Sequence, residues 1–247
     1  MNIFVTGASA GIGRSTCLKF AEAGHQVLAV ARRSDALKNL DEMHTSIKTA
    51  QLDINNASAF SDLVQSESDF FSQLDVLVNN AGLALGQEAF QESTDQDIET
   101  MIQTNISSLF RITRSVLPQM ISRKKGHIIN LGSIAGHTAY KGGSVYCATK
   151  AAVHMFSEAL RSDLGGTGLR VSTIAPGRVE TEFSEVRYKG DKEKAKKVYQ
   201  GFRPLSSNDI ADSIYWMATQ PEHVNIQHVV IMGTDQPNAT TVVPLES

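Results

Sequence analysis

The chain has 247 residues, of which 41% are hydrophobic and 20% are charged, and its formal net charge at pH 7 is −3. This composition is typical of a globular protein with one large domain, and the slight negative charge argues against a nucleic-acid partner. No run of about 18 apolar residues predicts a membrane span, and the first residues do not resemble a signal peptide. Two cysteines, Cys17 and Cys147, favour a reducing cytoplasm over a disulfide framework.

Short apolar runs alternate with longer amphipathic segments along the whole chain. We expect strands at 2–6, 26–31, 47–54, 75–80, 127–132, 169–176 and 227–232, and helices at 14–24, 34–43, 56–67, 94–120, 145–164 and 207–219. The strands are apolar at nearly every position, which is typical of parallel sheets covered by helices on both faces. The alternation predicts one α/β domain over residues 1–247, a Rossmann fold with a doubly wound parallel sheet of about seven strands.

A glycine-rich turn, VTGASAGIG at 5–13, follows the first expected strand and opens the first helix. In a doubly wound sheet this position binds the pyrophosphate of a dinucleotide on the helix N-terminus. Gly7, Gly11 and Gly13 would provide the turn, the close backbone approach and the helix packing. The lysine and Ser/Thr of a triphosphate-binding loop are missing, so a kinase or an ATPase is disfavoured.

The second expected strand ends at Ala31 and is followed by Arg32 and Arg33. An acidic residue near this point favours the ribose 2′-hydroxyl of NAD, whereas an arginine accommodates the 2′-phosphate of NADP. A guanidinium can bind phosphate through two parallel hydrogen bonds. The alternative is a pair of solvated arginines at a helix start. We predict NADP(H), with Arg32 as the stronger candidate.

The segment YCATK at 146–150 places a phenol and an amine four residues apart, hence on one face of a helix. Taken alone, this pair could be the polar face of an ordinary helix. The seven histidines show no ligand spacing, and we expect His127, His137 and His154 to be surface or packing residues. No metal site is predicted.

Together these residues resemble the short-chain dehydrogenase/reductase family, and the resemblance covers essentially the whole chain. Thr6–Gly13 is similar to its Thr-Gly-x-x-x-Gly-x-Gly motif, 79–82 to its Asn-Asn-Ala-Gly motif, and 176–177 with Thr181 to its nicotinamide segment. The resemblance implies that Asn105, Ser133, Tyr146 and Lys150 are the catalytic set and that Asp53 lies against the adenine. The full set of cofactor residues that it implies is Gly7, Ser9, Gly11, Ile12, Gly13, Arg32, Arg33, Asp53, Asn79, Ala81, Gly82, Tyr146, Lys150, Pro176, Gly177, Val179 and Thr181.

The family chemistry is hydride transfer between the cofactor and a carbonyl or hydroxyl carbon, with Tyr146 as general acid and base. A free phenol has a pKa near ~10, so work near neutrality requires a lowering by about 3 units. A lysine ammonium about 4 Å away contributes on the order of 4 kcal/mol at an effective dielectric constant of about 20. We therefore expect Lys150 to supply much of this lowering, assisted by the positive nicotinamide ring. The resemblance further implies that Ser133 binds the substrate oxygen and that Asn105 anchors a water in a proton path from Lys150.

Four stretches, at 79–86, 142–150, 181–191 and 221–226, resemble one subgroup, the bacterial NADP-dependent 3-hydroxy acid dehydrogenases. The expected substrates are then serine, allo-threonine, 3-hydroxyisobutyrate or 3-hydroxypropionate and the matching 3-oxo acids. Two other enzyme readings are reduction of another small anionic aldehyde, such as sulfoacetaldehyde, and reduction of 3-oxoacyl thioesters. A non-catalytic NADP(H) sensor is a remote alternative, because all four catalytic residues stand in the chain.

An anionic substrate needs a cation beside the pocket. The run at 187–197 is rich in lysine, and most of it is expected to be a solvated helix face. Arg187 lies ten residues after Gly177, within the segment that family members fold over the substrate, and we predict that it binds the substrate carboxylate. Arg178 is a second candidate. The other predicted substrate-binding residues, Ser133 and Tyr146, would contact the reacting oxygen. The resemblance also implies a cytoplasmic homotetramer.

Overall fold

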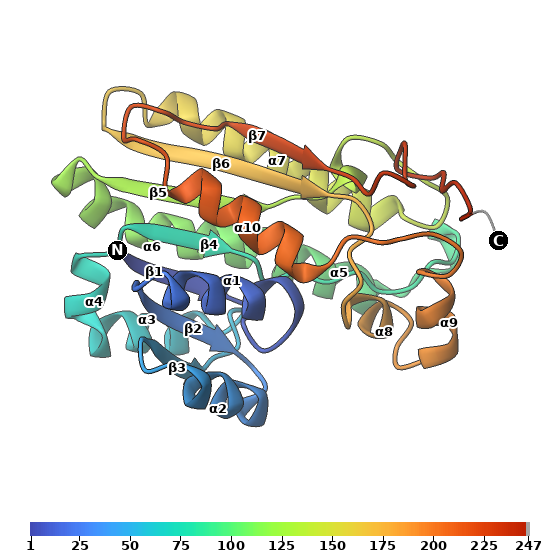
Figure 1. Cartoon of the computed structure of the whole chain (residues 1–247), viewed down its shortest axis with the longest axis horizontal. Helices are drawn as coiled ribbons and strands as arrows, with labels where there is room; N and C mark the ends of the chain where they lie inside the picture. Colours follow the sequence, from blue (N-terminus) through green and yellow to red (C-terminus); the bar gives the residue numbers. More distant parts are fainter. Residues whose placement is uncertain (246–247) are drawn as a thin grey trace.

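The computed structural model describes residues 1–245 and contains one seven-stranded sheet in which all neighbouring strands are parallel (Figure 1). The strand order is β3-β2-β1-β4-β5-β6-β7. The strands are β1 (Asn2–Thr6), β2 (Gln26–Ala31), β3 (Ile47–Gln51), β4 (Val76–Asn79), β5 (Gly126–Leu131), β6 (Leu169–Pro176) and β7 (His228–Ile231). The predicted doubly wound parallel sheet is confirmed.

Helices cover both faces of the sheet because both faces are apolar. Along β1, Ile3 and Val5 pack into one hydrophobic core and Phe4 packs into the other, as the two-residue period of a strand requires. The first core is completed by α1 (Gly11–Glu22), α2 (Ser34–Met43) and α10 (Ser207–Ala218). The second is completed by α3 (Ala57–Ser66), α4 (Ser68–Ser72), α6 (Ser108–Arg123) and α7 (Ser144–Asp163).

The main departure from the predicted elements lies in the segment expected to be one helix over 94–120. The structure has α5 (Asp95–Ile102), a π-helical turn η2 (Gln103–Ser107) and then α6. Such wide turns often occur at functional sites, and this one carries Asn105. The first helix also starts earlier than expected, at Gly11, so that its first turn includes part of the glycine loop.

Short elements complete the chain. They are η1 (Phe90–Glu92), η3 (Ile134–Gly136), α8 (Phe183–Arg187) and α9 (Lys192–Lys197). The expected charged helix face corresponds to α9, whose lysines are exposed. The helices of residues 1–245 include none that is both long and apolar enough to cross a membrane.

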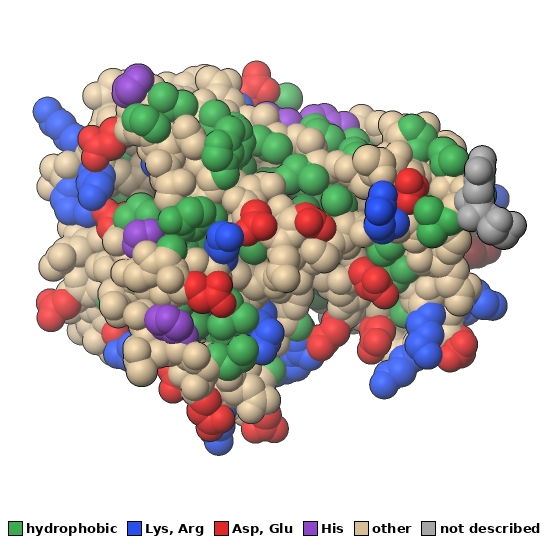
Figure 2. All heavy atoms as spheres, in the orientation of Figure 1, with side chains coloured by type: hydrophobic (Ala, Val, Ile, Leu, Met, Phe, Trp, Pro, Cys, Tyr) green, Lys and Arg blue, Asp and Glu red, His purple; other side chains and the backbone are tan. Residues whose placement is uncertain are grey.

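The strand order reverses between β1 and β4, and ligands of such sheets bind at this point, beyond the carboxyl ends of the strands. In Figure 1, α8 and α9 stand beyond that end of the sheet. Figure 2 shows a notch in the molecular surface between the region of α1 and α2 and that of α8 and α9. The fold therefore places the predicted site residues around one opening.

Candidate active site

The glycine loop between β1 and α1 adopts a conformation that only small residues allow. Gly7 has φ +70° and Gly11 has φ +50°, both in the left-handed region. A Cβ atom on Gly7 would lie 2.8 Å from the Cα of Ala81, in the loop after β4. The loop therefore packs directly on the Asn-Asn-Ala-Gly segment. The first residues of α1 line a cavity of about 380 Å³.

This cavity has the residues that a dinucleotide would need. All the predicted cofactor residues line it except Gly13 and Asn79. Gly13 packs behind the loop, where a Cβ would meet the Gly7 carbonyl oxygen at 2.4 Å. The Asn79 side chain points into the protein and donates to Thr113 Oγ1 and Asn130 Oδ1, at 2.9 and 2.8 Å. Its neighbour Asn80 lines the cavity instead, a residue that the sequence analysis did not single out.

The two arginines after β2 have different surroundings. Arg33 donates to Ser9 Oγ in the glycine loop, at 3.2 Å from Nε and 3.1 Å from Nη2, and forms a 2.6 Å ion pair with Glu182. Arg32 is exposed, and its carbonyl accepts a hydrogen bond from Gln51. Both line the cavity, together with Asp53. Arg33 is therefore the arginine that contacts the glycine loop. The sequence had favoured Arg32 as the stronger candidate for the 2′-phosphate.

Tyr146 and Lys150 lie one turn apart on α7 and are both buried. Lys150 Nζ lies 5.9 Å from the centre of the Tyr146 ring and donates to the carbonyl oxygen of Leu131 at 2.8 Å. Burial lowers the pKa of Lys150 to about 8. Burial raises the pKa of the Tyr146 phenol, opposed by a hydrogen bond from Ser133 and by the charge of Arg187. In the protein without cofactor, desolvation therefore outweighs the groups that lower the pKa of the phenol. The expected lowering by Lys150 together with the nicotinamide ring stays a prediction.

Ser133 and Asn105 reach this pair from other elements. Ser133 follows β5, lines both the dinucleotide cavity and a larger neighbouring cleft, and accepts a hydrogen bond from the amide of Ala135 at 3.1 Å. The buried Asn105 side chain accepts from the Leu83 amide and donates to the Leu83 carbonyl, both at 2.8 Å. It thus fixes the chain beside Lys150 but does not line either cavity.

The larger cleft, of about 1020 Å³, opens on the other side of Tyr146 and holds the predicted substrate cations. The Arg187 guanidinium lies 6.0 Å from the Tyr146 ring centre and donates to Gly86 O, Tyr140 Oη and Gly142 O at 3.0, 2.8 and 3.2 Å. Arg178 instead stacks on Phe202 and donates to Val198 O. Of the two predicted substrate cations, Arg187 is therefore the one that lies beside Tyr146.

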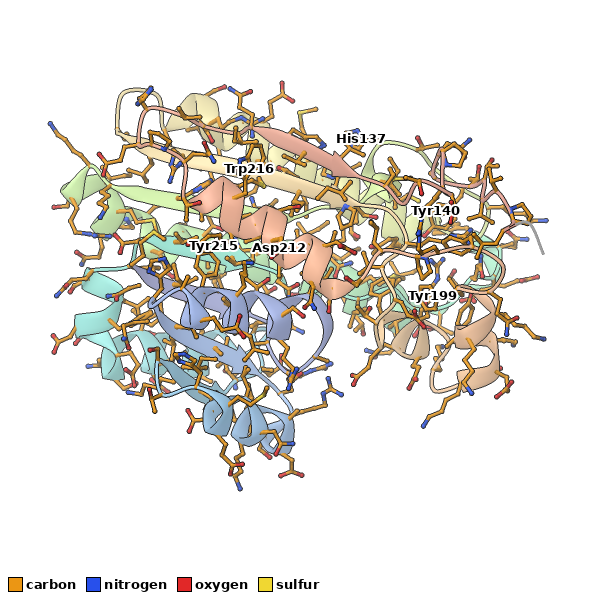
Figure 3. The ribbon with its side chains drawn as sticks, viewed as in Figure 1. His137, Tyr140, Tyr199, Asp212, Tyr215 and Trp216 are labelled. Atoms are coloured by element: carbon orange, nitrogen blue, oxygen red, sulfur yellow. The ribbon has the colours of Figure 1, made fainter. Side chains whose placement is uncertain are left out.

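Two further residues of the cleft have no signal in the sequence. The Arg187 guanidinium lies over the Tyr140 ring, 5.3 Å from the centre of that ring. Gln236, in the segment after β7, is buried and accepts a hydrogen bond from the Arg178 amide at 2.8 Å. Figure 3 shows Tyr140 and Tyr199 on the same side of the molecule as α8 and α9. Only the folded chain brings these distant segments together.

The fold and the site define a class of protein: a parallel α/β fold with a dinucleotide cavity beside a buried tyrosine and lysine. A family model described as short chain dehydrogenase matches residues 1–192. The chain is 49% identical over 238 residues to the NADP-dependent 3-hydroxy acid dehydrogenase YdfG of Salmonella typhi, covering 96% of each chain. It is 41% identical to the serine 3-dehydrogenase of Agrobacterium fabrum, covering 95% of this chain and 94% of that one.

Two solved structures of serine dehydrogenases are similar to this chain over nearly its whole length. The closed form of serine dehydrogenase complexed with NADP⁺ is 44% identical and matches the whole of both chains with a TM-score of 0.94. Serine dehydrogenase from Escherichia coli is 41% identical, with a TM-score of 0.84 over 96% of this chain and 99% of that one. The chain belongs to the short-chain dehydrogenase family.

Proposed function

We propose that this protein is an NADP-dependent oxidoreductase that interconverts a small 3-hydroxy acid and its 3-oxo acid or semialdehyde. The observation that carries the substrate class is the guanidinium of Arg187 held beside the Tyr146 ring, inside a cleft next to the dinucleotide cavity. A cation at that point suits a substrate whose carboxylate lies a short distance from the reacting carbon. The names of the 3-hydroxy acid and serine dehydrogenases that the chain resembles support the same class.

The proposed chemistry divides among the four catalytic residues. Bound NADP(H) supplies or accepts the hydride. Tyr146 gives its proton to the carbonyl oxygen during reduction and removes it from the hydroxyl during oxidation, while Ser133 donates a hydrogen bond to the same oxygen. Lys150 provides a positive charge near the phenol, and Asn105 holds the Leu83 backbone beside Lys150. The water-anchoring role that the family resemblance implies for Asn105 remains part of this proposal.

The pH dependence follows from the buried Tyr146–Lys150 pair. Since burial lowers the pKa of Lys150 to about 8, the pair has lost one proton above that pH, and Tyr146 can then pass the proton of the substrate hydroxyl on to the neutral amine of Lys150. Oxidation needs an unprotonated group to take the hydroxyl proton, so its kcat/KM should rise with pH and level off above about 8. Reduction needs a protonated group to supply a proton to the carbonyl oxygen, so its kcat/KM should decline above the same pH. Initial rates in both directions across neutral to alkaline pH test this prediction. Flat profiles in both directions would contradict it.

Cofactor preference should depend on Arg33. Replacing Arg33 with Ala removes charge-assisted hydrogen bonds worth about 1.5–3 kcal/mol to a 2′-phosphate, so we expect the preference for NADP⁺ over NAD⁺ to fall by about tenfold or more. The kcat/KM ratio for the two cofactors measures the effect. Arg14→Ala is a matched control, because Arg14 is half-buried on α1, contacts Met43 and does not line the cavity. An unchanged ratio in Arg33→Ala, with a reduced one in Arg32→Ala, would move the role to Arg32.

The substrate proposal is tested by following NADP⁺ reduction with L- and D-serine, L-allo-threonine, 3-hydroxyisobutyrate, 3-hydroxypropionate and isethionate. Turnover of the carboxylates supports the proposal and ranks them. Turnover of isethionate alone would identify a sulfonate-aldehyde reductase, and NADPH oxidation with 3-oxoacyl thioesters alone would identify a thioester reductase. NADPH binding without any turnover would support a sensor.

We also propose that the protein assembles with copies of itself, as the family resemblance implies, in the form of a homotetramer. Exposed apolar side chains support this: Phe110 on α6, Met155 on α7, Trp216 on α10 and Val230 on β7. Hydrophobic side chains gather over the region of α10 and β7 in Figure 2, and Figure 3 labels Trp216 there. The two cysteines are buried and unpaired, which supports the proposal of a reducing, cytoplasmic location.

A further inference from the structure

His154 contacts the backbone of the proposed catalytic serine. It lies on α7 one turn after Lys150, and its Nε2 accepts a hydrogen bond from the Ser133 amide at 3.3 Å. The Ser133 hydroxyl accepts from Ala135 at 3.1 Å, within the same turn. Both the main chain and the side chain of Ser133 are therefore held, and the histidine is the contact that comes from outside the turn.

The turn around Ser133 leaves room for the imidazole through two glycines. A Cβ atom on Gly132 would lie 2.3 Å from His154 Nε2, and one on Gly136 would lie 2.6 Å from His154 Cε1. Contacts this short do not occur between real side chains, so any larger residue at either position would displace the ring or the turn. The backbone on both sides of Ser133 is thus fitted to this imidazole.

The surroundings keep the His154 ring neutral, which its role as an acceptor requires. Burial lowers the pKa of His154 to about 3, and the charges of His137, His228 and Lys150 act in the same direction. The His137 and His228 rings lie 4.5 and 5.1 Å from the His154 ring, and their Nε2 atoms are 2.8 Å apart.

A neutral imidazole that accepts at Nε2 carries its proton on Nδ1. Nδ1 of His154 is buried and has no hydrogen-bond partner within residues 1–245. A buried unpartnered polar atom is unfavourable, and those that persist in native structures call for an explanation. The same three histidines do not form a metal site, since residues 1–245 contain no group of three or more potential ligands with suitable geometry.

We propose that His154 is a positioning residue: its neutral imidazole holds the Ser133 main chain so that the Ser133 hydroxyl faces the phenol of Tyr146. This inference rests on the proposed roles of Ser133 and Tyr146. It explains why the half-buried ring packs against two glycines. Because the Ser133 hydrogen bond lowers the pKa of Tyr146, a loosened serine should also change the pH dependence of the reaction.

The test compares His154→Leu, which removes the acceptor but keeps an apolar side chain, with His154→Gln, whose amide oxygen can reach the Nε2 position. We expect His154→Leu to lower kcat by about tenfold to a hundredfold, the effect of a small misplacement. It should also move the pH midpoint of oxidation upward, while the KM for NADP⁺ stays the same. His154→Gln should recover most of the loss.

A double-mutant cycle separates positioning from a general loss of structure. In a Ser133→Ala background, His154→Leu should have little further effect on kcat, because the side chain that it positions is gone. An equal loss in both backgrounds, with no rescue by His154→Gln, would overturn the inference. Melting temperatures and NADPH binding of all variants show whether each one folds.

A second measurement does not depend on the substrate. In protein labelled with ¹⁵N-histidine, His154 should appear as the neutral Nδ1–H form at all pH values above about 5, whereas a free imidazole titrates near about 6.5. A His154 that gains its proton near that pH, or that shows the Nε2–H form, would refute the inference. If the wild-type protein turns over no hydroxy acid while His154 shows the expected form, the proposed function fails and the contact stands.

Discussion

Tyr146→Phe should lower kcat for hydroxy acid oxidation by about 1,000-fold or more while NADPH still binds. The phenol lines both cavities and is the group proposed to exchange a proton with the substrate oxygen, and general acid–base catalysis contributes about 10²–10⁴-fold. The substitution removes one oxygen and keeps the ring that packs against Phe183, with centroids 5.6 Å apart. Folding should therefore be unaffected.

The measurement is steady-state kinetics with NADPH fluorescence as the binding control. Tyr215→Phe is a matched variant, since Tyr215 lies on α10, far from the cleft (Figure 3), and packs against Phe20. It should leave kcat unchanged. A Tyr146→Phe protein that retains more than about a tenth of the wild-type kcat would show that another group transfers the proton.

Arg187→Met should raise KM for carboxylate substrates by about tenfold to a hundredfold and affect neutral aldehydes much less. Three of the five guanidinium N–H groups are engaged by Gly86, Tyr140 and Gly142, and the remaining two have no partner within residues 1–245. Two N–H groups suit a carboxylate, and hydrogen bonds to charged groups contribute about 1.5–3 kcal/mol.

The same substitution also removes contacts that hold the cleft wall, so the comparison of substrates decides the result. A structural defect would impair carboxylates and neutral aldehydes alike, and equal losses would refute the carboxylate role. Arg178→Met is the matched control, because Arg178 lines the same cleft but stacks on Phe202. If Arg178→Met alone raised KM for carboxylates, the substrate cation would be Arg178.

Most of the fold could be predicted from the sequence because the five inner strands are apolar on both faces. The strands 2–6, 26–31 and 169–176 have the predicted bounds, and the other four differ at their ends by up to three residues. The π-helical turn at Asn105 could not be foreseen, because the periodicity of 94–120 is close to that of a continuous α-helix. The wide turn is set by tertiary contacts, among them the hydrogen bonds of Asn105 to Leu83.

The site shows a similar division. Motifs that lie close together in the sequence, such as the glycine loop and the Tyr146–Lys150 pair, led to residues that line the expected cavities. Contacts between distant segments gave no signal: Arg187 meets Gly86 across 101 residues, and His154 meets Ser133 across 21. The effect of burial on the pKa of Tyr146 gave no signal either, because spacing reports the nearby lysine but not the extent of burial.

The most direct test of the account is the ratio of kcat/KM for 3-hydroxyisobutyrate and its methyl ester, measured with NADP⁺. The two compounds share the reacting hydroxyl and differ in the negative charge that Arg187 is proposed to bind. The account predicts that the acid is preferred by about tenfold or more and that Arg187→Met removes most of this preference. Equal turnover of acid and ester by the wild-type enzyme, or a preference for the ester, would contradict it.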